Sequence, residues 1–176
     1  MVSYLNRRTI LRLAFSCLAL FVVLGCAKTP QKIQNSVSKT IFFSTKDFRF
    51  YDLGLIKTYP NHTTLEIFNA GTLLLQMECY KHKVCLNQTC YAKESFSRRL
   101  LGEDTFDDLD FRAILLGEEI FFGQNKQTNS SGFTQIIKRG NSLLHYQVKE
   151  DSILLQIQNP QSKIKFALEI NALPET

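Results

Sequence analysis

The sequence predicts an α+β domain, a curved antiparallel sheet or unclosed β-barrel with two short helices packed in or over its concave face. Runs of alternating apolar and polar residues lie on both sides of one helical stretch, and this order of strands, helices and strands is typical of α+β folds. Short turns separate the runs, which indicates antiparallel neighbours. The chain also holds 14 Phe and no Trp, which predicts an interior rich in phenylalanine.

The first residues have the composition of an export signal. Three arginines within residues 1–12 precede an apolar run over 13–24, the order found in secretory signals. This run of about 12 residues is too short for a spanning helix, which needs about 20. The motif Val23-Leu24-Gly25-Cys26 resembles the lipobox of bacterial lipoproteins. The resemblance implies that residues 1–25 are removed and that Cys26 is acylated.

The composition after the signal predicts a tethered domain. Residues 26–39 are polar and read as a flexible tether, and the folded domain is expected over 40–172. The chain has 21 basic and 16 acidic residues. Three basic residues lie in the signal, so the remaining net charge of +2 is too small for a nucleic-acid surface. Ala27 after the acylated cysteine favours, by analogy with lipoproteins, anchoring in lipid of the outer membrane facing the periplasm.

Two strands are especially well defined, at 64–68 and 72–79, because polar residues alternate there with apolar ones. Asn69-Ala70-Gly71 forms the link between them, and Gly71 can take a positive φ. Further strands are predicted by the same signals at 41–43, 48–51, 53–56, 84–86, 89–91, 133–138, 143–148, 153–157 and 164–170. The polar stretch 124–132 reads as a loop.

Three cysteines, Cys79, Cys85 and Cys90, would remain in an oxidising compartment, so at most one internal bridge can form among them. A two-residue turn at Asn87-Gln88 would place Cys85 opposite Cys90, about 4.5 Å apart between Cα atoms and within disulfide range. If residues 81–83 form the preceding turn, Cys79 also faces Cys85. The preferred pair is Cys85–Cys90; Cys79–Cys85 and no bridge are the alternatives. A hairpin CxxxxC is typical of a structural bridge rather than a redox site.

Two short helices are predicted in the middle of the chain. The first covers 93–101 and ends at Gly102. The second begins at Thr105, with Asp108 three residues later as in a capping box, and ends at Gly117. Its apolar stripe contains Phe106, Leu109, Ala113 and Leu116.

The chain offers no candidate catalytic residues. His62, His82 and His145 stand alone, and no metalloprotease, hydrolase, P-loop or dinucleotide motif is present. We therefore expect no enzyme activity, no metal and no cofactor.

The run Leu65 to Leu75, with Asn69, Gly71 and Thr72 at its turn, resembles the LolB family. So do the two helices, the second ending in Phe111 to Gly117, and the final strand 164–170. LolB proteins are outer-membrane lipoproteins that receive other lipoproteins from a periplasmic carrier. The resemblance implies an unclosed barrel whose cavity binds acyl chains, so lipoprotein acyl chains and a periplasmic carrier are expected partners. The expected lining residues face inward: Phe50, Leu65, Ile67, Leu73, Leu75, Phe96, Leu109, Leu116 and Phe166.

The chain departs from the family at two positions. Ala70 stands alone between Asn69 and Gly71, where the family carries a projecting leucine associated with membrane insertion of the cargo. Ala113 replaces a family tryptophan. The same apolar residues would also form a packed core. The alternative function is therefore a structural or assembly lipoprotein that docks on an outer-membrane protein and has no ligand cavity.

Overall fold

The structure is a computed structural model, and it describes residues 32–46, 48–101, 105–161 and 164–173. The predicted signal 1–25, Cys26 and Gly102 lie outside the described residues. Lys32 onward forms one compact unit.

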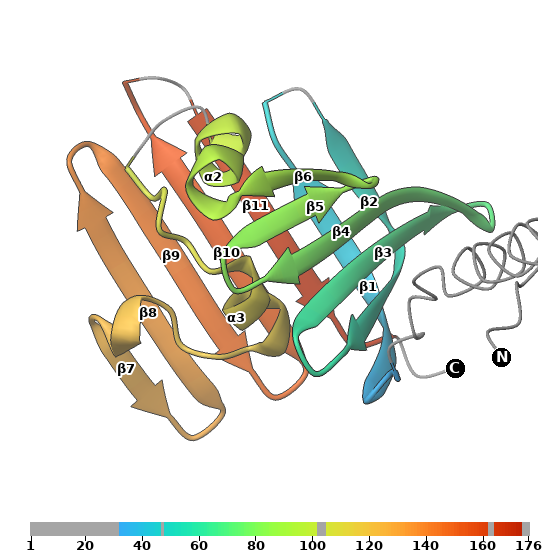
Figure 1. Cartoon of the computed structure of the whole chain (residues 1–176). Helices are drawn as coiled ribbons and strands as arrows, with labels where there is room; N and C mark the ends of the chain where they lie inside the picture. The colour runs from blue at the N-terminus through green and yellow to red at the C-terminus, as the bar shows by residue number, and fades with distance from the viewer. Residues whose placement is uncertain (1–31, 47, 102–104, 162–163, 174–176) are drawn as a thin grey trace, which may run out of the picture. The chain divides into compact units, whose positions relative to one another are not determined.

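An antiparallel sheet of eleven strands makes up most of the described chain (Figure 1). Its strands are β1 (Asn35–Ser44), β2 (Arg49–Thr58), β3 (His62–Asn69), β4 (Thr72–Tyr80), β5 (Lys83–Leu86), β6 (Thr89–Ala92), β7 (Lys126–Asn129), β8 (Gly132–Arg139), β9 (Ser142–Lys149), β10 (Ser152–Asn159) and β11 (Ile164–Asn171). The predicted curved antiparallel sheet with short helices is therefore confirmed at this level.

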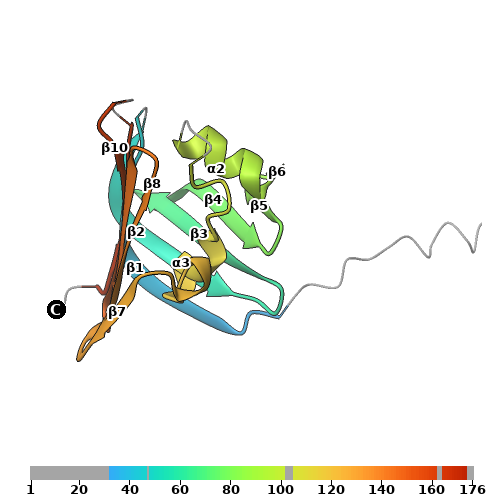
Figure 2. The ribbon, with the colours of Figure 1, turned by 90° about the vertical axis from the view of Figure 1, so that its left-hand side faces the viewer.

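The two halves of the chain meet where β1 pairs with β11. Every other pair joins strands consecutive in the chain, so β6 and β7 are the two edges of the sheet. The sheet is strongly curled, and its β3 to β6 arm turns over the β8 to β11 arm (Figure 2). Since β6 and β7 do not pair, the sheet stays unclosed.

The helices lie on the concave side of the sheet, between its two arms (Figure 2). Helix α2 covers Lys93–Leu101, as predicted. Helix α3 covers only Phe111–Leu116, and a short 3-10 turn, η1, follows at Phe121–Gly123. α3 packs against β3, β4 and β10, so it touches both arms.

Alternation along the strands places the core on the concave face. On β1, Ile41 and Phe43 are buried, and Phe43 pairs with the buried Phe50 of β2. Phe42 lies between them and belongs to the convex face. Gly54 continues the concave row, and a Cβ there would lie 2.3 Å from Cγ1 of Ile41. β2 and Ile41 therefore pack too closely for any side chain at position 54.

Two boundaries differ from the sequence prediction. β1 begins at Asn35, within the segment 26–39 predicted as a tether, because 35–39 pair along the length of β2. β7 occupies part of the predicted loop 124–132 and pairs with β8. All four residues of β7 are exposed, so this edge strand lacks the apolar alternation by which a strand is recognised.

A disulfide joins Cys85 and Cys90 across the β5–β6 hairpin. Asn87 and Gln88 both have positive φ, as a type I′ two-residue turn requires. The expectation that Cys79 might face Cys85 is wrong: β4 and β5 are joined by a two-residue turn, so Cys79 lies opposite Val84 and Glu78 opposite Cys85. Cys79 is a buried free thiol.

Among the described residues, none of the helices has both the length and the apolar character that a transmembrane span requires.

Candidate functional site

The predicted lining residues divide into three groups. Six are buried in one apolar cluster with side chains of both sheet arms and both helices: Phe50, Leu65, Ile67, Phe96, Leu109 and Phe166. Leu75 and Leu116 are half-buried. Leu73 is 45% exposed. Six of the nine expected residues thus share one buried cluster, and Leu73 lies outside it.

The position of Leu73 has a local cause. The β3–β4 register shifts between Ile67 and Phe68, so that Ile67 pairs with Leu75 but Phe68 pairs with Leu73. Leu74 is the extra residue of this bulge, and the insertion places its two neighbours, Leu73 and Leu75, on opposite faces of the sheet. The prediction that Leu73 faces inward is wrong for this reason.

Aromatic side chains pack against one another across the described interior. The ring of Phe43 on β1 meets that of Phe166 on β11 edge to face, with 5.5 Å between centroids. Phe96 of α2 meets Phe111 of α3 in the same way at 5.2 Å. The first contact joins two strands and the second joins the two helices. Because α2 also contacts β5, β6 and β11, and α3 contacts β3, β4 and β10, the two helices act as the cover of the interior.

A hollow of about 480 Å³ lies at the open seam of the sheet. We call it the seam hollow. It spans the space from Lys93, directly after edge strand β6, to Gln124, directly before the turn into edge strand β7. Its lining consists of Lys93, Asp108, Asp110, Ala113, Glu118, Glu119, Ile120, Phe121, Phe122, Gln124 and Arg139.

Arg139, at the end of β8, links the sheet to the segment that leads into α3. Its guanidinium donates to both carboxylate oxygens of Asp108 and, at 3.3 Å, to the backbone oxygen of Thr105. It also lies over the ring of Phe121, 4.2 Å from the centroid, and 5.4 Å from that of Phe106. The Arg139 side chain thus holds both the segment that leads into α3 and the η1 turn to β8.

Helix α3 begins at Asp110, and the predicted start at Thr105 is wrong. The Asp110 side chain accepts hydrogen bonds from the backbone N–H groups of Arg112 and Ala113, at 3.0 and 3.1 Å. Asp108 does not cap a helix because it pairs with Arg139. The predicted end is confirmed, since Gly117 is the C-cap with a φ of 68°. The segment 105–110 is thereby a turn that carries Phe106 and Leu109 into the core.

Two buried polar side chains fix the loop between α3 and β7. Gln135 accepts from the N–H of Ile120 and donates to the backbone oxygens of Ile120 and Gln124, all within 2.9 Å. The Tyr146 hydroxyl donates to the Glu118 oxygen at 2.9 Å; burial, with the nearby Glu118 charge, raises the pKa of Tyr146. This support holds two consecutive aromatic residues, Phe121 and Phe122, at positive φ.

The Phe122 side chain points fully into solvent. Non-glycine residues at positive φ cost free energy and persist where their surroundings enforce them.

The sequence did not single out Arg139, Gln135, Phe121 or Phe122. Of these residues, only Gln135 stands out in the sequence pattern. It is a polar residue between Phe133 and Ile137 at the positions of β8 that face inward.

No protein-family model, curated protein or solved structure matches the chain. The function is therefore inferred from the chain's own residues.

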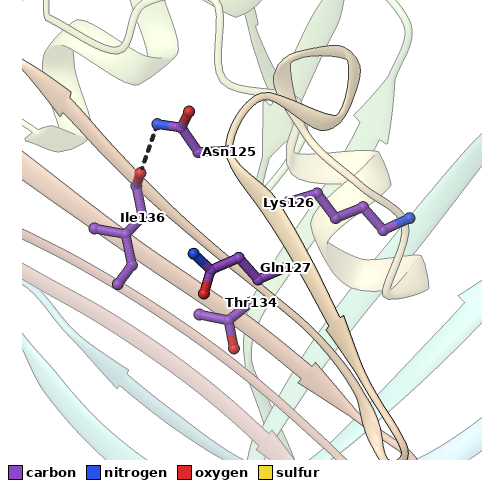
Figure 3. Close-up of a pocket in the computed structure, with 5 residues that line it drawn as sticks. All are labelled: Asn125, Lys126, Gln127, Thr134 and Ile136. Carbon is purple, nitrogen blue, oxygen red and sulfur yellow. Dashed lines mark hydrogen bonds between the residues drawn. The ribbon is translucent and has the colours of Figure 1, made fainter.

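Two further hollows are bounded mostly by residues outside the predicted lining. One of about 330 Å³ is bounded by Asn125, Lys126, Gln127, Thr134 and Ile136, and Asn125 donates to the Ile136 backbone oxygen at 3.0 Å (Figure 3). Its lining is mostly polar and belongs to the β7–β8 edge. The other, of about 150 Å³, contains Leu116 but none of the remaining predicted lining residues.

Among the described residues, there is no group of three or more His, Cys, Asp or Glu side chains that could hold a metal ion.

His62 stacks between Tyr59 and Tyr80, with ring centroids 4.3 and 4.7 Å away. Burial lowers the pKa of His62, against a smaller opposing effect of Glu78. This histidine is packed as a neutral ring.

Proposed function

We propose that the chain is a lipid-anchored protein of the outer membrane that binds the acyl chains of lipoproteins between its concave sheet face and its helices. The supporting observation is the continuous apolar cluster that α2 and α3 cover in an unclosed sheet. The lipobox resemblance supplies the anchor at Cys26, and the LolB resemblance supplies the ligand class and a periplasmic carrier as donor.

Ligand binding at this place requires the cover to move, because side chains of both helices are buried against the concave face of the sheet. Helices of nine and six residues are too short to be stable on their own, so they depend on the sheet. Their link through Arg139 and Asp108 is an ion pair between side chains 30% and 51% exposed, and such pairs contribute only about 0–1 kcal/mol. This polar link therefore adds little to the apolar contacts of the helices, which a ligand in the interior would have to replace.

A fluorescent long-chain fatty acid tests the proposal on residues 32–176, which contain the whole described core. We expect saturable binding that an acylated peptide displaces. Arg139→Ala should tighten binding, because the free energy needed to displace the cover falls. Lys138→Ala is the matched control, since Lys138 is exposed on the same strand and should leave binding unchanged. Absence of saturable binding in both the unmodified chain and Arg139→Ala would refute the proposal.

A second function is favoured by one observation, the packing of aromatic side chains against one another across the described interior. In that case the protein is a structural or assembly lipoprotein that docks on an outer-membrane protein. Crosslinking in cells separates the two. Recovery of one outer-membrane protein without bound lipid supports docking, whereas recovery of acylated proteins supports acyl-chain binding.

A further inference from the structure

Large apolar side chains gather on the convex face of the sheet over β1 to β4. We call this group the outer patch; it consists of Phe42, Tyr51, Leu53, Phe68 and Leu73. Tyr51 is 69% exposed, and Leu53 and Leu73 are each 45% exposed. Exposed apolar patches of this kind mark surfaces that contact other molecules.

The strand register makes the outer patch continuous. Phe42 on β1 pairs with Tyr51 on β2, and Phe68 on β3 pairs with Leu73 on β4. Leu53 follows Tyr51 on the same face of β2, one position before Gly54, which pairs with Ile67 of β3. The patch therefore runs across four neighbouring strands.

The charges around the outer patch nearly balance. The Arg49 guanidinium lies 5.8 Å from the centroid of the Phe42 ring, and Glu169 of β11 is the register partner of Phe42. Lys57 and Glu66 neutralise each other at 2.8 Å on the same face. Contact with this patch would thus be driven by burial of apolar area, with charge as a minor contribution.

The chain outside the described fold limits where the domain can lie. Eight residues lie between Cys26 and Asn35, the first residue of β1, and this stretch spans at most about 30 Å when extended. An acylated Cys26 would keep Asn35, where the patch strand β1 begins, within that distance of the bilayer. A tether this short gives an effective concentration in the millimolar range, at which weak apolar contacts become occupied.

We propose that the outer patch rests on the lipid surface and orients the anchored domain. The inference depends on the anchoring part of the proposed function but not on acyl-chain binding. Tyr51 suits this position because a tyrosine ring is apolar on its body and polar at its hydroxyl, as in the aromatic belts of membrane interfaces. The concave side, with the helices and the seam hollow, would then face away from the membrane.

Quenching by brominated lipids tests the orientation without the natural acyl anchor. Residues 32–176 carrying an N-terminal histidine tag are held on vesicles of phosphatidylethanolamine, phosphatidylglycerol and a nickel-chelating lipid. An environment-sensitive dye is attached at Leu53→Cys in one sample and at Ile136→Cys in another. Ile136 is the matched control because it is 52% exposed on the other arm. Cys79 is buried, and Cys85 and Cys90 are bonded to each other, so the introduced thiol is the labelled one.

We expect lipids brominated in their acyl chains to quench the dye at position 53 at least about threefold more strongly than the dye at position 136. Tyr51→Gln should reduce the quenching at position 53, and its thermal unfolding should match that of the parent. Equal quenching at both positions, or none at position 53, would overturn the proposal. Failure of fatty-acid binding alone would leave this result unaffected.

Discussion

Arg139 binds both carboxylate oxygens of Asp108, so a single side chain at the end of β8 holds the segment that leads into α3. The same guanidinium lies over the Phe121 ring. A mutation at Arg139 would therefore loosen the cover of the interior and leave the sheet intact, because Arg139 is the terminal residue of its strand.

Arg139→Ala should increase amide hydrogen exchange in α3 and lower the free energy of unfolding by about 1 kcal/mol, in line with an exposed pair plus a cation–π contact. Exchange in β1 and β11 should not change. Lys138→Ala serves as the control and should match the parent chain. Equal acceleration of exchange in β11 would show that Arg139 supports the whole fold rather than the cover.

Asp110→Ala should destabilise the chain by about 1 kcal/mol, because two backbone N–H groups of α3 lose their acceptor. Asp110→Asn should recover most of this loss, since an asparagine oxygen also caps a helix. Urea unfolding provides the measurement. The side chain of Thr105, the start that the sequence favoured, does not cap α3, so a loss for Thr105→Ala equal to that of Asp110→Ala would contradict the observed helix start.

Gly54→Ala should destabilise the chain by about 1–3 kcal/mol, the usual range for overpacking, because its Cβ would overlap the Ile41 side chain. The cause is checked with a double-mutant cycle. Adding Ile41→Ala should cost less in the Gly54→Ala chain than in the parent. Strict additivity of the two changes would place the strain elsewhere.

Thiol titration checks the cysteine assignment in residues 32–176. The folded chain should react slowly or not at all, because burial raises the pKa of Cys79 and shields its sulfur. Unfolding without a reductant should expose the Cys79 thiol alone, and reduction should add those of Cys85 and Cys90. Three thiols in the unfolded, unreduced chain would exclude the Cys85–Cys90 bridge.

Acid should weaken the fold through His62. Burial lowers the pKa of His62 in the folded state, so below the unfolded value of about 6.5 the unfolded chain binds a proton that the folded chain does not. Stability contributed by the neutral ring is thus present above that pH and is lost as the pH falls through it. Urea unfolding between pH 7.5 and pH 5 should show a smaller decrease in His62→Gln than in the parent. An identical decrease would mean that other groups cause it.

Much of the fold follows from local patterns in the sequence. Alternation identified β3 and β4, and the pair Asn87-Gln88 located the β5–β6 turn that brings Cys85 to Cys90. Helix α2 was predicted with its observed bounds. These features depend on neighbours within a few residues, which is the range over which periodicity and turn chemistry act.

The errors have long-range causes. Thr105 is not a helix start because Asp108 is paired with Arg139, 31 residues away. Leu73 faces outward because a bulge opposite Phe68 shifts the register. The seam hollow could not be predicted because its walls come from α2, α3, η1 and β8, and only the folded sheet brings them together.

Photo-crosslinking tests the central proposal, acyl-chain binding in the interior, most directly. A fatty acid with a photoreactive group at its methyl end is bound to residues 32–176, irradiated, and located by mass spectrometry of peptides. The account predicts labels on concave-face residues such as Leu65, Ile67 and Phe166, more heavily in Arg139→Ala than in the parent. Labels confined to the convex face, around Tyr51 and Leu53, would contradict it.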